Sequence, residues 1–299
     1  MPLSKKDVHR YPEEENNLSI SHGDYFSAVR SFLTQNRFEV LTSTLTQHFN
    51  QDIRTDEIKE IRIVLEKHGE FYHPARIEVV VYGKVASFVV NVAVSDVGNE
   101  YILKDFKLMQ RLNTEFPQSF IPKVYGKGEV PVKDGDIVLR MFLGEWFEGF
   151  NEFHMTRNNK DEEPKLIVWY PDDDNVFLSE DQAKELYSQV AMILTYYYNI
   201  ETFEQISLWH HAAGDFVVKL DDEKMETRLV TIRKYISMFD GNDAEEQAPE
   251  ASVVLNALLV FFLNLSIRTR LDRLDGIGDM VWSDNIAIDG TLNGFFKVW

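Results

Sequence analysis

The chain has 299 residues, of which 44% are hydrophobic and 13% aromatic, enough for one large hydrophobic core or two moderate ones. Its 49 acidic residues outnumber the 31 basic ones, and a formal charge of -18 repels a phosphate backbone, so we expect no nucleic-acid partner. There is no cysteine, which excludes disulfides, thiolate zinc sites and cysteine nucleophiles.

The sequence predicts a cytoplasmic protein without a membrane partner. The first residues run into three glutamates without an apolar segment, so they lack the character of a secretory signal. The most apolar stretch, residues 253–267, is shorter than the roughly 20 residues of a spanning helix. Asn256 and Asn264 also interrupt it. We therefore predict a buried helix there.

The first elements are two helices followed by strands. Residues 24–33 carry apolar side chains at helical spacing, and a second helix is predicted over residues 38–49. An antiparallel meander of three strands should follow, because three runs rich in β-branched and aromatic residues are separated by turn residues. These runs are residues 58–67, 75–82 and 85–95, with Gly83 and Lys84 as a predicted hairpin turn.

The hydrophobic period then changes from two to about 3.6 residues, which indicates a helix that ends before Pro117. Its apolar face consists of Tyr101, Phe106, Leu108, Met109 and Leu112. Residues 124–130 and 137–143 predict two more strands, joined by a Lys-Asp-Gly-Asp turn. After Ser179, a helix-capping residue, helical patterns dominate. The expected order is sheet, helix, sheet and then a largely helical half.

Three segments in the middle of the chain carry a family resemblance. They are residues 105–112, residues 120–126 (Phe-Ile-Pro-Lys-Val-Tyr-Gly) and residues 138–146 (Val-Leu-Arg-Met-Phe-Leu-Gly-Glu-Trp). In this order they resemble a helix, a strand and the hinge strand of the aminoglycoside-phosphotransferase branch of the protein-kinase-like superfamily. The resemblance covers roughly residues 79–235. It implies an α+β, two-lobed protein-kinase-like fold with a helical extension over 1–56, a β-rich N-lobe over 57–144 and a mainly helical C-lobe over 145–299.

The resemblance also implies positions for a catalytic loop. Gly214 and Asp215, followed by Phe-Val-Val, are similar to the family's glycine–asparagine step, so Asp215 would replace the metal-binding asparagine and keep an oxygen ligand. Counting back, His210 stands for the aspartate that accepts the substrate's hydroxyl proton, and a histidine can act as this base. Glu145 and Trp146 would then meet the adenine of ATP, and Mg²⁺ would bind at Asp215.

Several positions depart from the family's pattern. Phosphoryl transfer depends on neutralising the triphosphate with a lysine and magnesium. Asn91 stands at the lysine position of the third strand, and Asp105 replaces the helix glutamate that orients the lysine. Thr231 replaces the main magnesium aspartate, although Lys219 and Arg233 are candidate cations for a phosphate if they are not simply solvated.

Three functional readings therefore stay open. The first is a nucleotide-dependent phosphotransferase that acts on a small hydroxyl-bearing substrate. The second is a catalytically inactive kinase-like protein, a pseudokinase, that binds a ligand or a protein partner. The third is an unrelated α+β binding protein.

Two features near the C-terminus also have more than one interpretation. Asp272, Asp275, Asp279 and Asp284 could hold magnesium or calcium, which prefer oxygen ligands. Alternatively, Gly276 ends the long helix at Leu274 and the aspartates form a polar turn. The apolar residues 294–299 are expected to dock on the core or on another subunit, so a homo-oligomer is an open possibility.

Overall fold

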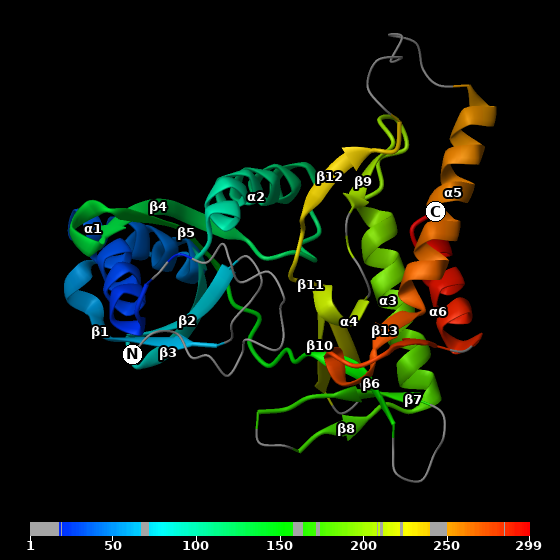
Figure 1. Cartoon of the computed structure of the whole chain (residues 1–299), viewed down its shortest axis with the longest axis horizontal. Helices are drawn as coiled ribbons and strands as arrows, with labels where there is room; N and C mark the ends of the chain where they lie inside the picture. Colours follow the sequence, from blue (N-terminus) through cyan, green and yellow to red (C-terminus); the bar gives the residue numbers. More distant parts are fainter. Residues whose placement is uncertain are drawn as a thin grey trace. The chain divides into compact units, whose positions relative to one another are not determined.

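The computed structural model describes residues 18, 20–66, 72–157, 164–171, 174–207, 209, 212–221, 224–239, 250–283 and 285–299. These residues form a mixed α+β protein with a five-stranded antiparallel sheet and six α-helices. The chain divides into two compact units (Figure 1). Unit 1 comprises Met1–Pro117 and Pro122–Glu148, and unit 2 comprises Gln118–Ile121 and Gly149–Trp299.

The sheet of unit 1 combines a meander with a later strand pair. The meander consists of β1 (Ile58–Leu65), β2 (Tyr72–Val81) and β3 (Lys84–Ala93). β5 (Ile137–Glu145) pairs with β3, and β4 (Val124–Val132) pairs with β5, so the strand order is β1-β2-β3-β5-β4. This pairing confirms the predicted meander and the predicted strand pair. Both could be predicted because period-two alternation and turn residues mark them in the sequence.

The hairpin between β2 and β3 lies one residue before the predicted position. Val81 pairs with Lys84, so the two turn residues are Tyr82 and Gly83. Both have positive φ, 52° and 73°. A two-residue turn of this kind matches the twist of the flanking strands but needs two positive φ values. Lys84 therefore begins β3.

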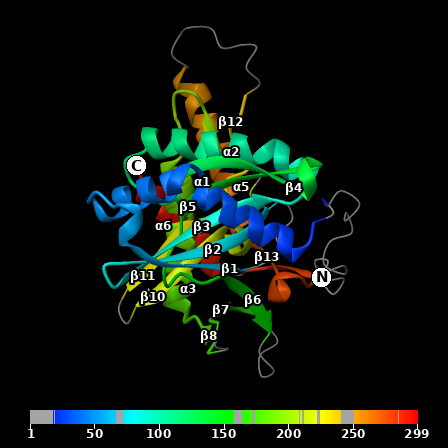
Figure 2. The ribbon, with the colours of Figure 1, turned by 90° about the vertical axis from the view of Figure 1, so that its left-hand side faces the viewer.

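One face of this sheet packs against α1 (His22–Phe49), which Figure 2 shows lying across the strands. Asp24 and Ser21 form a capping box, in which each side chain accepts a hydrogen bond from the other residue's backbone N–H. Residues 35–38 interrupt the helix with non-helical backbone angles, so the two helices predicted for this segment are confirmed. Apolar side chains of both halves join the main core, which includes Tyr25, Phe32, Leu41, Ile77 and Leu143.

The opposite face of the sheet packs against α2 (Asp96–Glu115). The rings of Phe106 in α2 and Phe142 in β5 lie 5.9 Å apart. The next residue of β5, Leu143, belongs instead to the core beneath α1. Because successive side chains of a strand point to opposite faces, α1 and α2 cover different faces of the sheet.

The described part of unit 2 combines helices with four small antiparallel sheets. The helices are α3 (Glu180–Tyr196), α4 (Ala212–Asp215), α5 (Ala251–Thr269) and α6 (Asn285–Phe296). The sheets are β6-β7-β8, β10-β11, β12-β9 and β13-β14. Their strands are β6 (Phe153–Arg157), β7 (Pro164–Val168), β8 (Val176–Phe177), β9 (Glu204–Ser207), β10 (Phe216–Asp221), β11 (Lys224–Leu229), β12 (Lys234–Ser237), β13 (Leu271–Arg273) and β14 (Met280–Trp282). This half therefore contains more strand than the sequence predicts.

Two glycines let α6 approach α3 closely. A Cβ atom on Gly290 would lie 2.6 Å from the carbonyl oxygen of Lys184, and one on Gly294 would lie 2.0 Å from that of Ser188. Both distances are shorter than any side chain tolerates, so the backbones meet only because these residues have none. The residues that follow Gly294 are partly exposed, including Phe296 and Trp299.

The prediction that residues 253–267 form a buried helix is wrong. α5 forms there and is long and apolar enough to cross a membrane by length and composition, but only 17% of its most apolar window is buried. Its buried residues are Ala257, Phe261, Leu265 and Thr269, which form one stripe against the rest of unit 2. α5 also ends at Thr269 and not at Leu274, so Gly276, with φ +74°, is instead the last residue of a separate 3-10 turn, η5 (Leu274–Gly276).

Candidate functional site

The expected metal ligand Asp215 is bound by an arginine. Asp215 ends α4 and directly precedes β10, and Arg233 lies in the segment between β11 and β12. The Arg233 Nη1 donates to Asp215 Oδ1 across 2.7 Å. The Asp215 side chain is 2% exposed and that of Arg233 is 29% exposed. A charge-assisted bond of this length neutralises the buried carboxylate.

The backbone also ties this segment to α4. Phe216 pairs with Leu229 in the β10–β11 hairpin, and the next residue, Val230, donates its N–H to the Asp215 carbonyl oxygen. Thr231 follows and is half-buried. The fold therefore brings Asp215, Thr231 and Arg233 together, whereas His210 lies outside the described residues. The other candidate cation of this region, Lys219, lies 3.6 Å from Asp221.

A buried histidine–aspartate pair lies in the same part of unit 2, because α4 packs against β6 and β13. His154 of β6 and Asp272 of β13 are both almost fully buried, and their Nδ1 and Oδ1 atoms lie 3.5 Å apart. The imidazole also lies 4.4 Å from the ring of Trp169. Gly276 leaves room for it, since a Cβ there would be 3.0 Å from the His154 ring.

Two of the four carboxylates predicted as a possible cation site, those of Asp272 and Asp275, accept hydrogen bonds from neighbouring groups. Asp272 accepts hydrogen bonds from the backbone N–H groups of Met155 and Arg273, at 2.6 and 2.7 Å. Asp275 accepts one from the Thr156 hydroxyl at 2.5 Å. Within the described ranges, no three histidine, aspartate or glutamate side chains are grouped to hold a metal ion. Asp284 lies outside these ranges.

In unit 1, the expected nucleotide-binding positions have apolar or tyrosine neighbours. Asn91 is half-buried in β3 and stands opposite Pro74 and Phe142 in the ladder. Asp105 of α2 accepts a 2.5 Å hydrogen bond from the Tyr72 hydroxyl. Burial, followed by the charge of Asp105, raises the pKa of Tyr72 far above its usual range. Asp105 thus binds a tyrosine hydroxyl, whereas the resemblance implies that the residue at this position orients a lysine.

Glu145 and Trp146, the expected adenine contacts, lie at the end of β5. The Glu145 backbone N–H donates to the Lys123 carbonyl oxygen at 2.8 Å, and the Lys123 N–H donates back to the Glu145 carboxylate at 3.1 Å. The guanidinium of Arg76 lies 5.6 Å from the centre of the Trp146 ring. The Glu145 N–H is therefore already used within unit 1.

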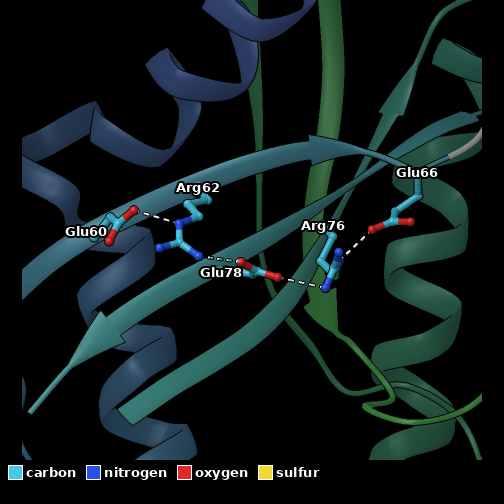
Figure 3. Close-up of polar contacts among 5 residues, drawn as sticks. All are labelled: Glu60, Arg62, Glu66, Arg76 and Glu78. Carbon is cyan, nitrogen blue, oxygen red and sulfur yellow. Dashed lines mark hydrogen bonds and ion pairs between the residues drawn. The ribbon is translucent and has the colours of Figure 1, made fainter. Parts of the chain in front are cut away.

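Arg76 also belongs to a row of alternating charges on β1, β2 and Glu66, the residue that follows β1 (Figure 3). Arg62 binds Glu60 at 2.6 Å and contacts Glu78 at 3.6 Å. Arg76 binds Glu78 at 2.7 Å and Glu66 at 2.5 Å. Arg62 and Glu78 stand directly opposite each other in the ladder, which favours such cross-strand pairs. We call these five residues the charge row.

His154 is the residue that sequence reasoning missed. It ends an aromatic segment, and nothing in its local pattern indicates a partner in β13. A scan against models of known protein families finds no match, and a search of curated proteins finds no significant match.

Proposed function

We propose that this chain is a catalytically inactive member of the protein-kinase-like superfamily that acts by binding a ligand or a protein partner. The layout of unit 1 supports this proposal. A three-strand meander, then α2, then β4 and β5 is the order that the resemblance implies. Residues 105–112 lie in α2, residues 120–126 lead into β4, and residues 138–146 form most of β5, so all three similar segments lie on elements of the expected type.

The ion pair between Asp215 and Arg233 carries the proposal that phosphoryl transfer is absent. Magnesium demands octahedral oxygen ligands and in phosphoryl-transfer sites is bound through one or two carboxylates. To serve as such a ligand, Asp215 would have to share its carboxylate between Arg233 and the metal or lose Arg233, and its side chain is 2% exposed. Breaking a buried pair leaves an uncompensated charge, which typically costs about 3–5 kcal/mol.

Unit 1 supports the same conclusion. Kinase-like catalysis needs a lysine on the third strand and a carboxylate on the following helix that orients it. Asn91 carries no charge, and Asp105 is bound to Tyr72. A phosphotransferase, the competing function, would need a cation from elsewhere in the chain.

The test is thermal unfolding of the full chain with millimolar ATP, with and without Mg²⁺, followed by measurement of phosphate release. We expect no magnesium-dependent rise in melting temperature and no phosphate release. A nucleotide at 100 times its Kd would stabilise the folded state by about 2.7 kcal/mol, so binding is easily seen. A shift that does not depend on magnesium would identify the ligand as a nucleotide and leave the proposal intact.

The proposal is overturned if the chain releases phosphate and the change Asp215→Ala abolishes the release. Asp221→Ala is the matched control, because Asp221 ends β10, the strand that directly follows Asp215, and its side chain is 61% exposed. Activity lost with Asp215→Ala and kept with Asp221→Ala would assign a catalytic role to Asp215.

A further inference from the structure

The outer side of α5 is apolar and exposed. Its exposed large side chains are Val253, Leu255, Leu259, Val260, Leu263 and Ile267, each at least 39% exposed. No charged residue occurs from Ala251 to Ile267. A helix that is apolar on all sides is normally covered on all sides, yet the described part of the chain covers only the stripe formed by Ala257, Phe261, Leu265 and Thr269.

The exposed side of α5 contains a palindrome centred on Val260. Asn256 and Asn264 lie four residues to either side of Val260, and Val253 and Ile267 lie seven residues to either side. At 3.6 residues per turn, all five residues fall within about 40° of the direction of Val260. All five are exposed. We call these five residues the palindromic stripe.

A palindromic surface is complementary to itself when two copies pair antiparallel. A twofold interface requires each residue i to meet j while j meets i. With Val260 on the axis, Asn256 lies level with Asn264 of the other copy, and Val253 lies level with Ile267. Apolar groups then meet apolar groups, and the two amides can hydrogen-bond to each other, as polar residues in helix pairs do when they fix the register.

Charge at the two ends of α5 follows the same symmetry. Glu250, the exposed N-cap residue, and Arg270, the C-cap residue, are each ten residues from Val260. Antiparallel pairing therefore places each Glu250 level with an Arg270 of the other copy. Each chain carries a charge of -18, but the surface that meets the other copy carries no net charge. The pairing therefore brings no carboxylates opposite each other.

We propose that α5 forms an antiparallel twofold interface with a second copy of this chain through the palindromic stripe. A lipid surface is the less suitable occupant. The amides of Asn256 and Asn264 would face hydrocarbon without partners, which costs free energy. The acidic chain is also repelled by anionic headgroups. This proposal does not depend on the proposed function, because no residue of α5 belongs to the candidate site.

The oligomeric state tests the proposal. Sedimentation equilibrium of the full chain should give twice the mass of 34.8 kDa, with a concentration-dependent return to monomer. Val260→Glu places two carboxylates on the twofold axis and should raise the dimer's Kd by at least about 100-fold. Leu255→Glu is the matched control, because it makes the same change at an exposed apolar position of α5 outside the stripe. It should change the Kd much less, and circular dichroism should show both variants folded.

Cysteine cross-linking tests the orientation, since the natural chain has no cysteine. Val260→Cys should form a disulfide-linked dimer under mild oxidation. Val253→Cys alone should not, because the two copies of residue 253 would lie about 21 Å apart along the helix axis. A mixture of Val253→Cys and Ile267→Cys should again cross-link.

Three results would overturn the proposal. The first is a monomer at all concentrations. The second is a dimer that Val260→Glu does not weaken, or that cross-links through Val253→Cys alone. The third is a monomer that floats with zwitterionic lipid vesicles and loses this binding with Val260→Glu, which would assign the stripe to a membrane surface.

Discussion

Arg233 donates to the buried carboxylate of Asp215 across 2.7 Å, and this bond links the segment after β11 to the end of α4. The Val230 N–H makes a second link to the same residue through its carbonyl oxygen. Two bonds of different kinds therefore hold this segment, and the side-chain bond is the one that a substitution can remove.

Arg233→Leu should destabilise unit 2 strongly, because it leaves Asp215 charged and buried without a partner. We expect a loss of about 3–5 kcal/mol in the free energy of unfolding, measured by urea denaturation. Arg54→Leu is the control, since Arg54 and Asp56 form an ion pair in which both side chains are about 70% exposed. Its effect should stay below about 1 kcal/mol. Equal effects of the two changes would show that the Asp215 pair is not effectively buried.

Gly294→Ala should separate α6 from α3. The new Cβ would lie 2.0 Å from the Ser188 carbonyl oxygen and 2.9 Å from the Ala191 Cβ, and backbone atoms cannot yield locally. We expect a loss of about 3 kcal/mol or more, seen as a lower melting temperature. Gly23→Ala in α1 meets only the Ser21 hydroxyl, at 3.5 Å, and should be neutral or slightly stabilising. A tolerated Gly294→Ala would contradict the close approach of the two helices.

Tyr72→Phe should cost unit 1 about 1–2 kcal/mol, because Asp105 loses a hydrogen bond from a partly buried hydroxyl. Asp105→Asn keeps an acceptor oxygen and should cost less. Chemical denaturation of both variants measures the difference. If the two changes lower the free energy of unfolding equally, the charge of Asp105 contributes as much to stability as its hydrogen bond with Tyr72.

Alkaline pH should destabilise the protein through its buried tyrosines. Burial raises the pKa of Tyr198 to about 12, and burial together with the charge of Glu145 raises that of Tyr125 to about 12. Both hydroxyls have an ordinary pKa of 10.0. The folded state therefore keeps protons that the unfolded state loses, so stability is fully present below pH 10 and falls as the pH rises towards 12.

Ultraviolet titration of the phenolate band measures this effect. Fewer than the chain's 12 tyrosines should ionise near pH 10 while it stays folded. Tyr25 and Tyr197, whose pKa values burial raises still further, should ionise only on unfolding. The denatured chain is the control, in which all tyrosines should titrate together. A single transition near pH 10 in the folded protein would contradict the burial.

Most of unit 1 could be predicted because its signals are local. Alternating residues mark β2 and β3, and Gly83 marks the turn between them. Unit 2 was harder. Strands such as β8 and β14 have two or three residues, too few to show a period, and their pairing depends on distant segments.

The candidate site shows the same limit. The resemblance predicts roles for Asp215 and Thr231. It does not predict that Arg233 binds Asp215, because that contact depends on a hairpin that brings together two residues 18 positions apart. His154 meets Asp272 through contacts between β6 and β13 that no local pattern encodes. The composition of α5 correctly indicated a helix, but composition cannot tell which sides of a helix the fold covers.

The charge row affects how this protein meets other copies of itself. β1 is an edge strand, so one side of its backbone has no neighbouring strand within the described sheet. Open edges invite pairing with another chain, and charged side chains along them oppose it. Glu60 and Arg62 place a half-exposed carboxylate and a half-exposed guanidinium along this edge, so a second β1 would have to dock beside charged side chains. Growth by strand addition is therefore discouraged at β1, whereas the uncharged face of α5 admits a contact that closes after two copies.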